Sequence, residues 1–291
     1  MEEIKETLPL PKATGMLREL QLATLKMMKK FDKVARENDI KYTLGAGSAI
    51  GAVVHKGFIP WDDDIDILMD RENFEKFLSI KDKILPPEIE YKDYFTDQSM
   101  NVLLSKLIDN STTMVTVDQY GRETTSGVAI DIGVYDFVPN GKFAKKLQWF
   151  NSITALILVN KIPPQNHGKL VKLYGNFILK FTRNKVKKVK KLVDKIKKFK
   201  KEKCTHLTLM TYLGENKMYF DKKMFEEYIE VDFEDCKFML IKEYDYYIRK
   251  RYNRDYTILP PKEERISWHN CKFLDTTIGF REYLKEKQNE V

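Results

Sequence analysis

A short run of alternating acidic and apolar residues constrains the fold of this chain more than any other feature. Ile65, Ile67 and Met69 alternate with Asp64, Asp66 and Leu68. A period of two predicts a β-strand over residues 64–69, with the isoleucines and the methionine buried on one face. The two aspartates then lie on the opposite face, about 6.6 Å apart along the strand. The alternatives are a turn with surface acids and a structural Ca²⁺ loop, although the Ca²⁺ loop pattern is not completed after Asp66.

Paired carboxylates on one face of a strand point to a divalent cation. Two like charges about 4 Å apart repel by about 4 kcal/mol where the effective dielectric constant is ~20, and a bound cation removes that cost. Hard oxygen ligands favour Mg²⁺ or Mn²⁺. A third carboxylate is needed if two metals, or one metal and a base, are to act on a phosphoryl group. We expect Asp131, in Ala129-Ile130-Asp131-Ile132, to supply it, with Asp136 as the reserve; for either residue the alternative is a strand-end acid.

A glycine cluster, Gly45-Ala46-Gly47-Ser48, lies upstream of the acidic strand. Glycines let backbone N–H groups approach phosphate oxygens, and a helix that begins near Ser48 directs its N-terminus toward an anion. We therefore expect Gly47 and Ser48 to contact phosphate. The cluster completes neither the dinucleotide-binding pattern nor the Walker loop, and the alternative is a tight turn.

The remaining pattern predicts an α/β chain of the α+β type, with a mixed sheet flanked by helices and a basic helical insertion. We expect residues 1–140 to form the catalytic core, 141–228 a helical, lysine-rich segment, and 229–291 a C-terminal helical segment that completes the substrate site. Helices are predicted at 15–38, 49–55, 71–84, 142–203 with a break at Pro163-Pro164, 221–230 and 236–252. Strands are predicted at 40–44, 64–69, 101–108, 112–117 and 128–138.

The positive charge of the chain is concentrated in one segment. The net charge is +8, but residues 180–203 carry thirteen Lys or Arg against two acids, which leaves −3 for the rest. Val186, Val189, Val193 and Ile196 recur at helical spacing, so this segment is predicted to be a basic amphipathic helix. It suits either a solvated face over a core stripe or a surface for an anionic membrane. No aromatic platform accompanies the lysines, and we expect no nucleic-acid partner.

The chain has the sequence character of a cytoplasmic protein. Its three cysteines are an odd number without a CxxC pair, which is unlike a disulfide framework. The first residues lack the basic and apolar regions of a secretory signal. The longest apolar stretch, Trp149 to Val159, is much shorter than the roughly 20 residues that span a bilayer. We expect a cytoplasmic location, with peripheral contact at the inner face of the cell membrane through 180–203.

Together the motifs resemble the nucleotidyltransferase signature of a glycine-serine turn, a paired-acid strand and a third acid. More narrowly, the twenty residues from Gly47 to Asp66 closely resemble the LicD family of phosphotransferases. The segment from Ile130 to Pro139 is similar to a second block of that family, and Tyr244 to Pro261 resembles a looser third one. The resemblance spans roughly Leu17 to His269 and is weak through the lysine-rich middle.

This resemblance implies a metal-dependent enzyme that moves phosphocholine, or a related phospho-alcohol, from a CDP-linked donor to a sugar. The acceptor would be a cell-envelope glycan such as teichoic acid. Asp64 and Asp66 would hold Mg²⁺ on the diphosphate, and Asp131 would complete the metal site or accept the proton of the acceptor hydroxyl.

The resemblance also suggests how the donor is held. Gly47 and Ser48 would cradle its phosphates, and Lys56 would neutralise the leaving CMP. Tyr244 and Tyr247 would line the donor site, because a choline head group favours an aromatic cage; the alternative for these tyrosines is a place in the core.

Two other functions fit the same residues. One is a nucleotidyltransferase that moves a nucleoside monophosphate from a nucleoside triphosphate to a small acceptor. The other is a non-catalytic, polyanion-binding protein whose acids bind a structural cation.

Overall fold

The fold is described from a computed structural model. It covers residues 8–116, 127–163, 169–212, 215–267 and 271–289. Val117, at the end of one predicted strand, and Pro164, in the predicted helix break, lie outside the described residues.

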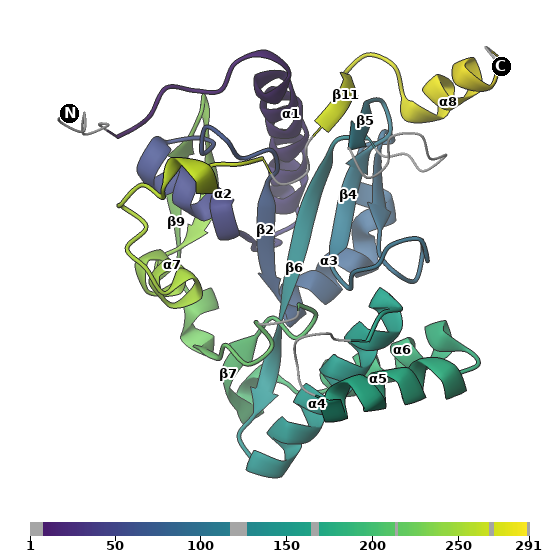
Figure 1. Cartoon of the computed structure of the whole chain (residues 1–291). Coiled ribbons are helices and arrows are strands. Elements are labelled where there is room, and N and C mark those ends of the chain that lie inside the picture. The colour runs from purple at the N-terminus through teal and green to yellow at the C-terminus, as the bar shows by residue number, and fades with distance from the viewer. Residues whose placement is uncertain (1–7, 117–126, 164–168, 213–214, 268–270, 290–291) are drawn as a thin grey trace.

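A mixed sheet forms the centre of the protein (Figure 1). Within the described residues it has seven strands: β1 (Thr43–Leu44), β2 (Asp66–Asp70), β3 (Ile89–Lys92), β4 (Ser105–Asp109), β6 (Ala129–Pro139), β7 (Cys204–Thr208) and β8 (Phe220–Asp221). The order is β1-β2-β6-β4-β3, with β7 beside β6 and β8 beside β7. β2 and β6 run parallel, and the other pairs are antiparallel. The predicted mixed α/β fold is confirmed.

Helices pack on this sheet and extend beyond it. They are α1 (Gly15–Glu37), α2 (Ala46–Ile50), α3 (Arg71–Ile84), α4 (Lys142–Asn160), α5 (Lys169–Phe181), α6 (Lys185–Ile196), α7 (Tyr244–Tyr252) and α8 (Phe280–Asn289). A π-helical turn, Gly51–His55, continues α2. Phe31 of α1 packs edge to face on Tyr42 and on Phe77 of α3, and all three side chains are fully buried. The apolar stripe predicted for residues 15–38 thus builds the main core.

Two small antiparallel sheets of two strands each complete the described chain. In one, β9 (Tyr228–Phe233) and β10 (Cys236–Ile241) form a hairpin, and in the other β5 (Thr113–Thr116) pairs with β11 (Cys271–Asp275) from far along the chain. The β9–β10 hairpin packs on the core through Phe233, whose ring lies 5.0 Å from that of Phe58.

The predicted helices at 221–230 and at 236–241 are wrong. A short 3-10 turn, Lys222–Phe225, leads into β9, and helix begins again only at Tyr244. The turn between β9 and β10 includes Glu234 with φ of 57°, so the chain reverses there, and the run Phe238–Ile241 of β10 is buried in the core. The helical character expected of 141–228 holds for α4 to α6 but not for β7, and β9, β10 and β11 lie in the segment 229–291 that was expected to be helical.

Candidate active site

The parallel pairing of β2 with β6 brings two of the predicted acids together. Asp66 is the register partner of Asp131, and Asp131 is in turn the register partner of Lys106 on β4. The Lys106 ammonium lies 2.7 Å from a carboxylate oxygen of Asp131. Three neighbouring strands therefore present a row of two carboxylates and one ammonium.

The acids crowd one another. Burial raises the pKa of Asp66 well above its ordinary value, and the charges of Asp64 and Asp131 raise it further. Burial works to lower the pKa of Lys106, but the charge of Asp131 outweighs it and the pKa is raised. Because the carboxylates repel and all offer hard oxygen donors, the residues fit a site for Mg²⁺ or Mn²⁺.

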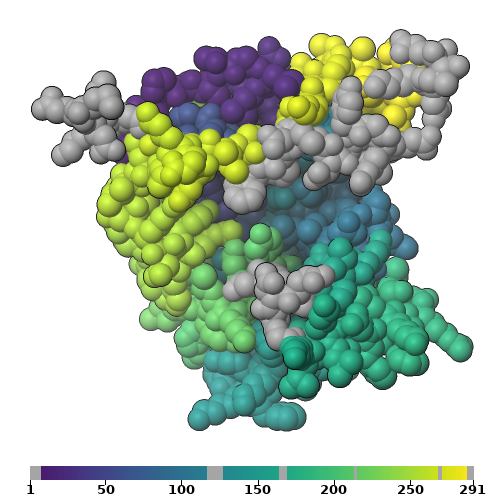
Figure 2. All heavy atoms as spheres, viewed as in Figure 1, coloured from purple at the N-terminus to yellow at the C-terminus, as the bar shows by residue number. Residues whose placement is uncertain are grey.

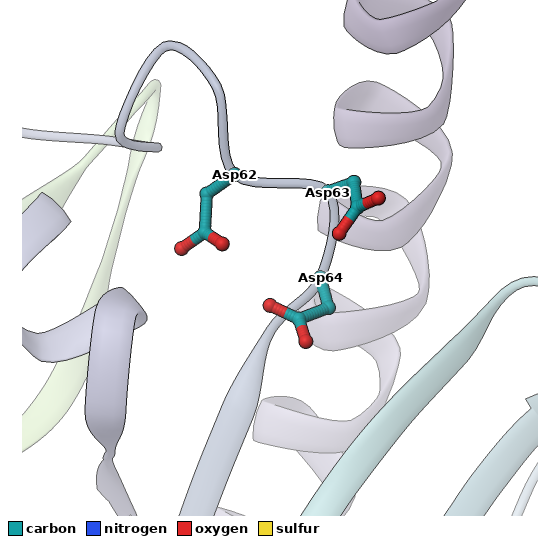
Figure 3. Close-up of side chains that lie close together, drawn as sticks. All are labelled: Asp62, Asp63 and Asp64. Carbon is teal, nitrogen blue, oxygen red and sulfur yellow. The ribbon is translucent and has the colours of Figure 1, made fainter. Parts of the chain in front are cut away.

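More acids precede β2. Oxygen atoms of Asp62, Asp63 and Asp64 all lie within 4.8 Å of one another, and Figure 3 shows the carboxylate of Asp64 turned toward that of Asp62. Asp63 is buried and accepts a hydrogen bond from the hydroxyl of Ser267. Asp62, Asp64 and Asp66 line a cleft, so Asp62 is better placed than Asp63 to join a metal site.

The glycine cluster fastens the start of α2 to the acidic strand. The N–H of Gly45 donates to the carbonyl of Asp66 (2.9 Å), and the N–H of Asp66 donates to the hydroxyl of Ser48 (3.0 Å). Ser48 is 3% exposed and thus holds β2 in place from within the core. Gly47 lines the cleft, where a Cβ atom would lie 2.4 Å from a carboxylate oxygen of Asp62. Only glycine fits at this position without moving that carboxylate.

An open cleft of about 640 Å³ lies above these residues. One wall comes from α2 and the acidic loop, and the other comes from the C-terminal segment 251–266. Its aromatic side chains are Trp61, Tyr212, Tyr252 and Tyr256. This volume is in the range of small-molecule sites.

A cation on the C-terminal wall faces the acids. Arg251 lines the cleft and is held from behind, with its guanidinium 2.7 Å from Glu215. It also donates to the hydroxyl of Tyr247 (3.1 Å), and that hydroxyl accepts the backbone N–H of Ala46 (3.1 Å). Burial works to lower the pKa of Arg251, but nearby Tyr247, Tyr252 and Glu215 raise it, so the residue stays charged.

The other residues that were predicted to bind the donor molecule do not line the cleft. Tyr247 is fully buried beneath the start of α2, and Tyr244 packs against the main core. Lys56 is exposed at the end of the π-helical turn, with φ of 53°. Asp136, the reserve acid, is fully buried and forms a two-point ion pair with Arg71 (2.8 and 3.1 Å).

Two charged residues at the site, Lys106 and Glu215, were not predicted from the sequence. Lys106 lies on a strand that the sequence predicts, but its position beside Asp131 follows from strand register, which is a long-range property. Glu215 follows a gap in the described chain and meets Arg251 from 36 residues away. The only available signal for Lys106 was a charged residue among apolar ones, and the sequence around Glu215 offered none.

Comparison with known proteins agrees with this geometry. Residues 39–155 match the family described as LicD/FKTN/FKRP, nucleotidyltransferase domain. The chain is 30% identical to the lipopolysaccharide cholinephosphotransferase LicD of Haemophilus influenzae over 282 aligned residues, which cover 87% of this chain and 96% of that protein. Uncharacterized proteins of Rickettsia prowazekii and Rickettsia typhi are each 44% identical over 46 residues, or 16% of this chain.

Proposed function

This chain belongs to the LicD family, and from that premise we propose that it transfers phosphocholine, or a related phospho-alcohol, from a CDP-linked donor such as CDP-choline to a sugar hydroxyl. The family relationship makes it a transferase. The acceptor in this proposal is a cell-envelope glycan such as teichoic acid or lipopolysaccharide.

The observation that carries the proposal is the row of acids beside the cleft. Asp66 lies beside Asp131 across two parallel strands, and Asp64 and Asp66 open into a cleft with a cation on the opposite wall. A diphosphate needs both kinds of group. Its negative charge is stabilised by cations, and the proton of the attacking hydroxyl needs an acceptor.

Asp64, Asp66 and Asp131 are the proposed metal ligands, and Asp62 is a further oxygen donor on the cleft wall. When bound there, Mg²⁺ or Mn²⁺ neutralises charge that develops on the donor phosphates. The crowding that raises the pKa of Asp66 is the feature that such a cation relieves.

The side chains then have separate roles in the transfer. Arg251 donates hydrogen bonds to phosphate oxygens, and Gly47 lets the backbone of α2 approach them. The acceptor hydroxyl oxygen attacks the phosphorus that carries choline, and the bond from that phosphorus to the oxygen of CMP breaks. The electron pair leaves with CMP, and a carboxylate of the row takes the hydroxyl proton; this role is the alternative to metal binding for Asp131.

The remaining predicted residues either position other groups of the site or lie away from the cleft. Ser48 positions Asp66 through its backbone N–H, and Tyr247 positions Ala46 and Arg251. Tyr244 and Lys56 lie away from the cleft wall, and their contact with the donor stays a prediction.

The two cleft walls support the expected division of the chain. The proposed catalytic core, residues 1–140, contributes the acids, and residues 229–291 contribute the facing wall with Arg251. Within the part of the chain that the structure describes, no helix has the length and hydropathy needed to cross a bilayer.

The test is the identity of the released nucleotide. Purified protein is incubated with Mg²⁺, CDP-choline and a sugar acceptor, and CMP is measured; a parallel reaction with CTP measures pyrophosphate. We expect CMP and phosphocholine-modified sugar from the parent and from Asp82→Asn, which changes an exposed acid on α3, but not from Asp66→Asn. Pyrophosphate from CTP would replace the proposal with nucleotidyl transfer, and CMP release by Asp66→Asn at the rate of the parent would refute the assigned site.

A further inference from the structure

Helix α5 carries apolar side chains that the described protein leaves uncovered. Leu170, Leu173, Phe177 and Phe181 are 82, 67, 57 and 63% exposed. Their spacings of three and four place them on one face of the helix. A helix buried in a globular core normally turns such a stripe inward.

Helix α4 continues this uncovered surface. Phe143 is 81% exposed, and Leu147 and Phe150 are each 46% exposed, again at spacings of four and three. The ring of Phe150 lies 5.3 Å from that of Tyr174 on α5, so the two stripes meet. We call these seven residues, Phe143, Leu147, Phe150, Leu170, Leu173, Phe177 and Phe181, the apolar face.

The surroundings of the apolar face are strongly cationic. No Asp or Glu occurs in the sequence between Asp136 and Asp194, whereas that stretch contains thirteen Lys or Arg. Lys169, Lys172 and Lys180 lie on α5 itself, and all three are exposed. Exposed leucine and phenylalanine on helices α4 and α5, whose charged residues are all cationic, are the pattern of helices that lie in a membrane interface.

The lysine-rich helix α6 supplies charge but no apolar surface of its own. Its apolar residues Val189, Leu192 and Ile196 are buried, the first two in a cluster with α4. The apolar stripe of α6, in the middle of the predicted basic segment 180–203, is therefore part of the core, and the exposed apolar surface is on α4 and α5.

The charge decides which partner fits the apolar face. Two copies of this chain pressed together through it would set two lysine-rich surfaces against each other, which like-charge repulsion opposes. A bilayer with anionic lipid offers apolar chains for the leucines and phenylalanines and negative head groups for the lysines.

We propose that the apolar face of α4 and α5 docks on a membrane surface that contains anionic lipid, with the lysines of α4, α5 and α6 on its head groups. This surface lies apart from the cleft. Asp131 is near the start of β6 and α4 begins just after its end, so the eight residue steps from Asp131 to Pro139 set them about 26 Å apart. Figures 1 and 2 show α4 to α6 protruding together at one corner of the molecule. The proposal does not depend on the proposed transferase activity.

Vesicle binding tests it. The full chain is sedimented with vesicles of phosphatidylcholine alone or of phosphatidylcholine with phosphatidylglycerol, at low and high salt. We expect binding to the anionic vesicles that weakens with salt and falls at least about tenfold in Leu170→Ser/Phe177→Ser and in Lys172→Glu/Lys180→Glu. Leu22→Ser on α1 and Lys237→Glu on β10 are the matched controls, because they change exposed residues elsewhere and should bind as the parent does.

Three further readouts keep the proposal open to refutation. Melting temperatures of the variants exclude simple unfolding, and CMP release with a soluble sugar acceptor should equal that of the parent. Equal vesicle binding by the parent and both double variants would overturn the proposal, as would no binding by the parent to either vesicle. A concentration-dependent dimer that the double variants abolish, without vesicle binding, would assign the face to a second copy instead.

Discussion

Asp66 and Asp131 lie side by side on parallel strands although 65 residues separate them in the sequence. Asp136, on the same strand as Asp131, is instead fully buried against Arg71. One strand thus carries the proposed catalytic acid near its start and, five residues later, an acid held in a buried ion pair.

These two acids should respond differently to the same substitution. Asp131→Asn is expected to abolish CMP release while the protein melts near the temperature of the parent, because the lost ion pair with Lys106 is offset by the relieved repulsion between Asp131 and Asp66. Asp136→Asn removes one partner of a buried pair and should lower the free energy of unfolding by about 3–5 kcal/mol. Denaturant unfolding and CMP release, measured on both variants, check this. Equal losses of stability in the two variants would contradict the assignment.

Gly47→Ala should impair transfer without unfolding the protein. The new Cβ would lie 2.4 Å from the Asp62 carboxylate, so that carboxylate has to move away from the cleft. A displacement of about 1 Å at a reacting site can cost about 10²-fold in rate, and we expect a loss of kcat of that order. Gly141→Ala is the control, since the nearest atom to its Cβ would be 4.0 Å away. Full activity in Gly47→Ala would show that the position of Asp62 is irrelevant.

Arg251 should contribute to binding the phosphates, with Glu215 as its positioning residue. Arg251→Gln is expected to lower kcat/KM for the donor by about 10²–10³-fold, the usual effect of losing one preorganised donor. Glu215→Gln leaves Arg251 in place but weakens its anchor, so we expect mainly a higher KM, by about tenfold. Arg249→Gln, on the exposed side of α7, should leave both kinetic constants unchanged. An unchanged KM in all three variants would remove Arg251 from the site.

The hairpin of β9 and β10 should confer a pH-dependent part of the stability. Burial works to raise the pKa of Glu234, but hydrogen bonds and charges from Arg18 and Lys12 outweigh it and lower the pKa to about 2. A depressed pKa stabilises the folded state above the ordinary value of 4.5, and this contribution is lost as the pH falls toward about 2.

Glu234→Gln should therefore melt below the parent at pH 7, and the difference should shrink steadily between pH 4.5 and about 2. Thermal unfolding at a series of pH values measures it. Asp235→Asn is the control, because its carboxylate is 72% exposed and the loss of its pair with Lys29 should matter little. A difference that stays constant over this range of pH would rule out the ion pairs of Glu234 as its source.

Strands and site residues could be predicted from the sequence where the local hydrophobic pattern agrees with the burial of the residues. The alternation around Asp66 predicted β2, and the position of Asp131 between two isoleucines predicted the third carboxylate, because both patterns report which face of a strand is buried. Register could not be predicted, so Lys106 was missed, and Asp131 was chosen as the third carboxylate from its place on a predicted strand and not from the strand that pairs with it. The segment 236–241 reads as helix from its neighbours, but packing of Phe238 and Leu240 on the core decides for a strand.

The tyrosines in the last third of the chain show a second property that could not be predicted, which is the side of a helix that faces the cleft. Tyr244 and Tyr247 recur at helical spacing, and α7 is indeed a helix, but spacing does not reveal which side of a helix faces a cleft. Tyr247 faces inward and supports Ala46, while Tyr252 and Arg251 face the cleft.

The length of β6 has a consequence for the choice of acceptor. This single strand joins the acids at its start to the helices at its end, and it is paired along its whole length, with β4 and β2 over its first part and with β7 at its end, which resists bending. With α4 and α5 resting on a bilayer, β6 would hold the proposed reacting carboxylates at a fixed height above the lipid. A hydroxyl group of a lipid-linked glycan would then be selected by its distance from the lipid as well as by the sugar that carries it.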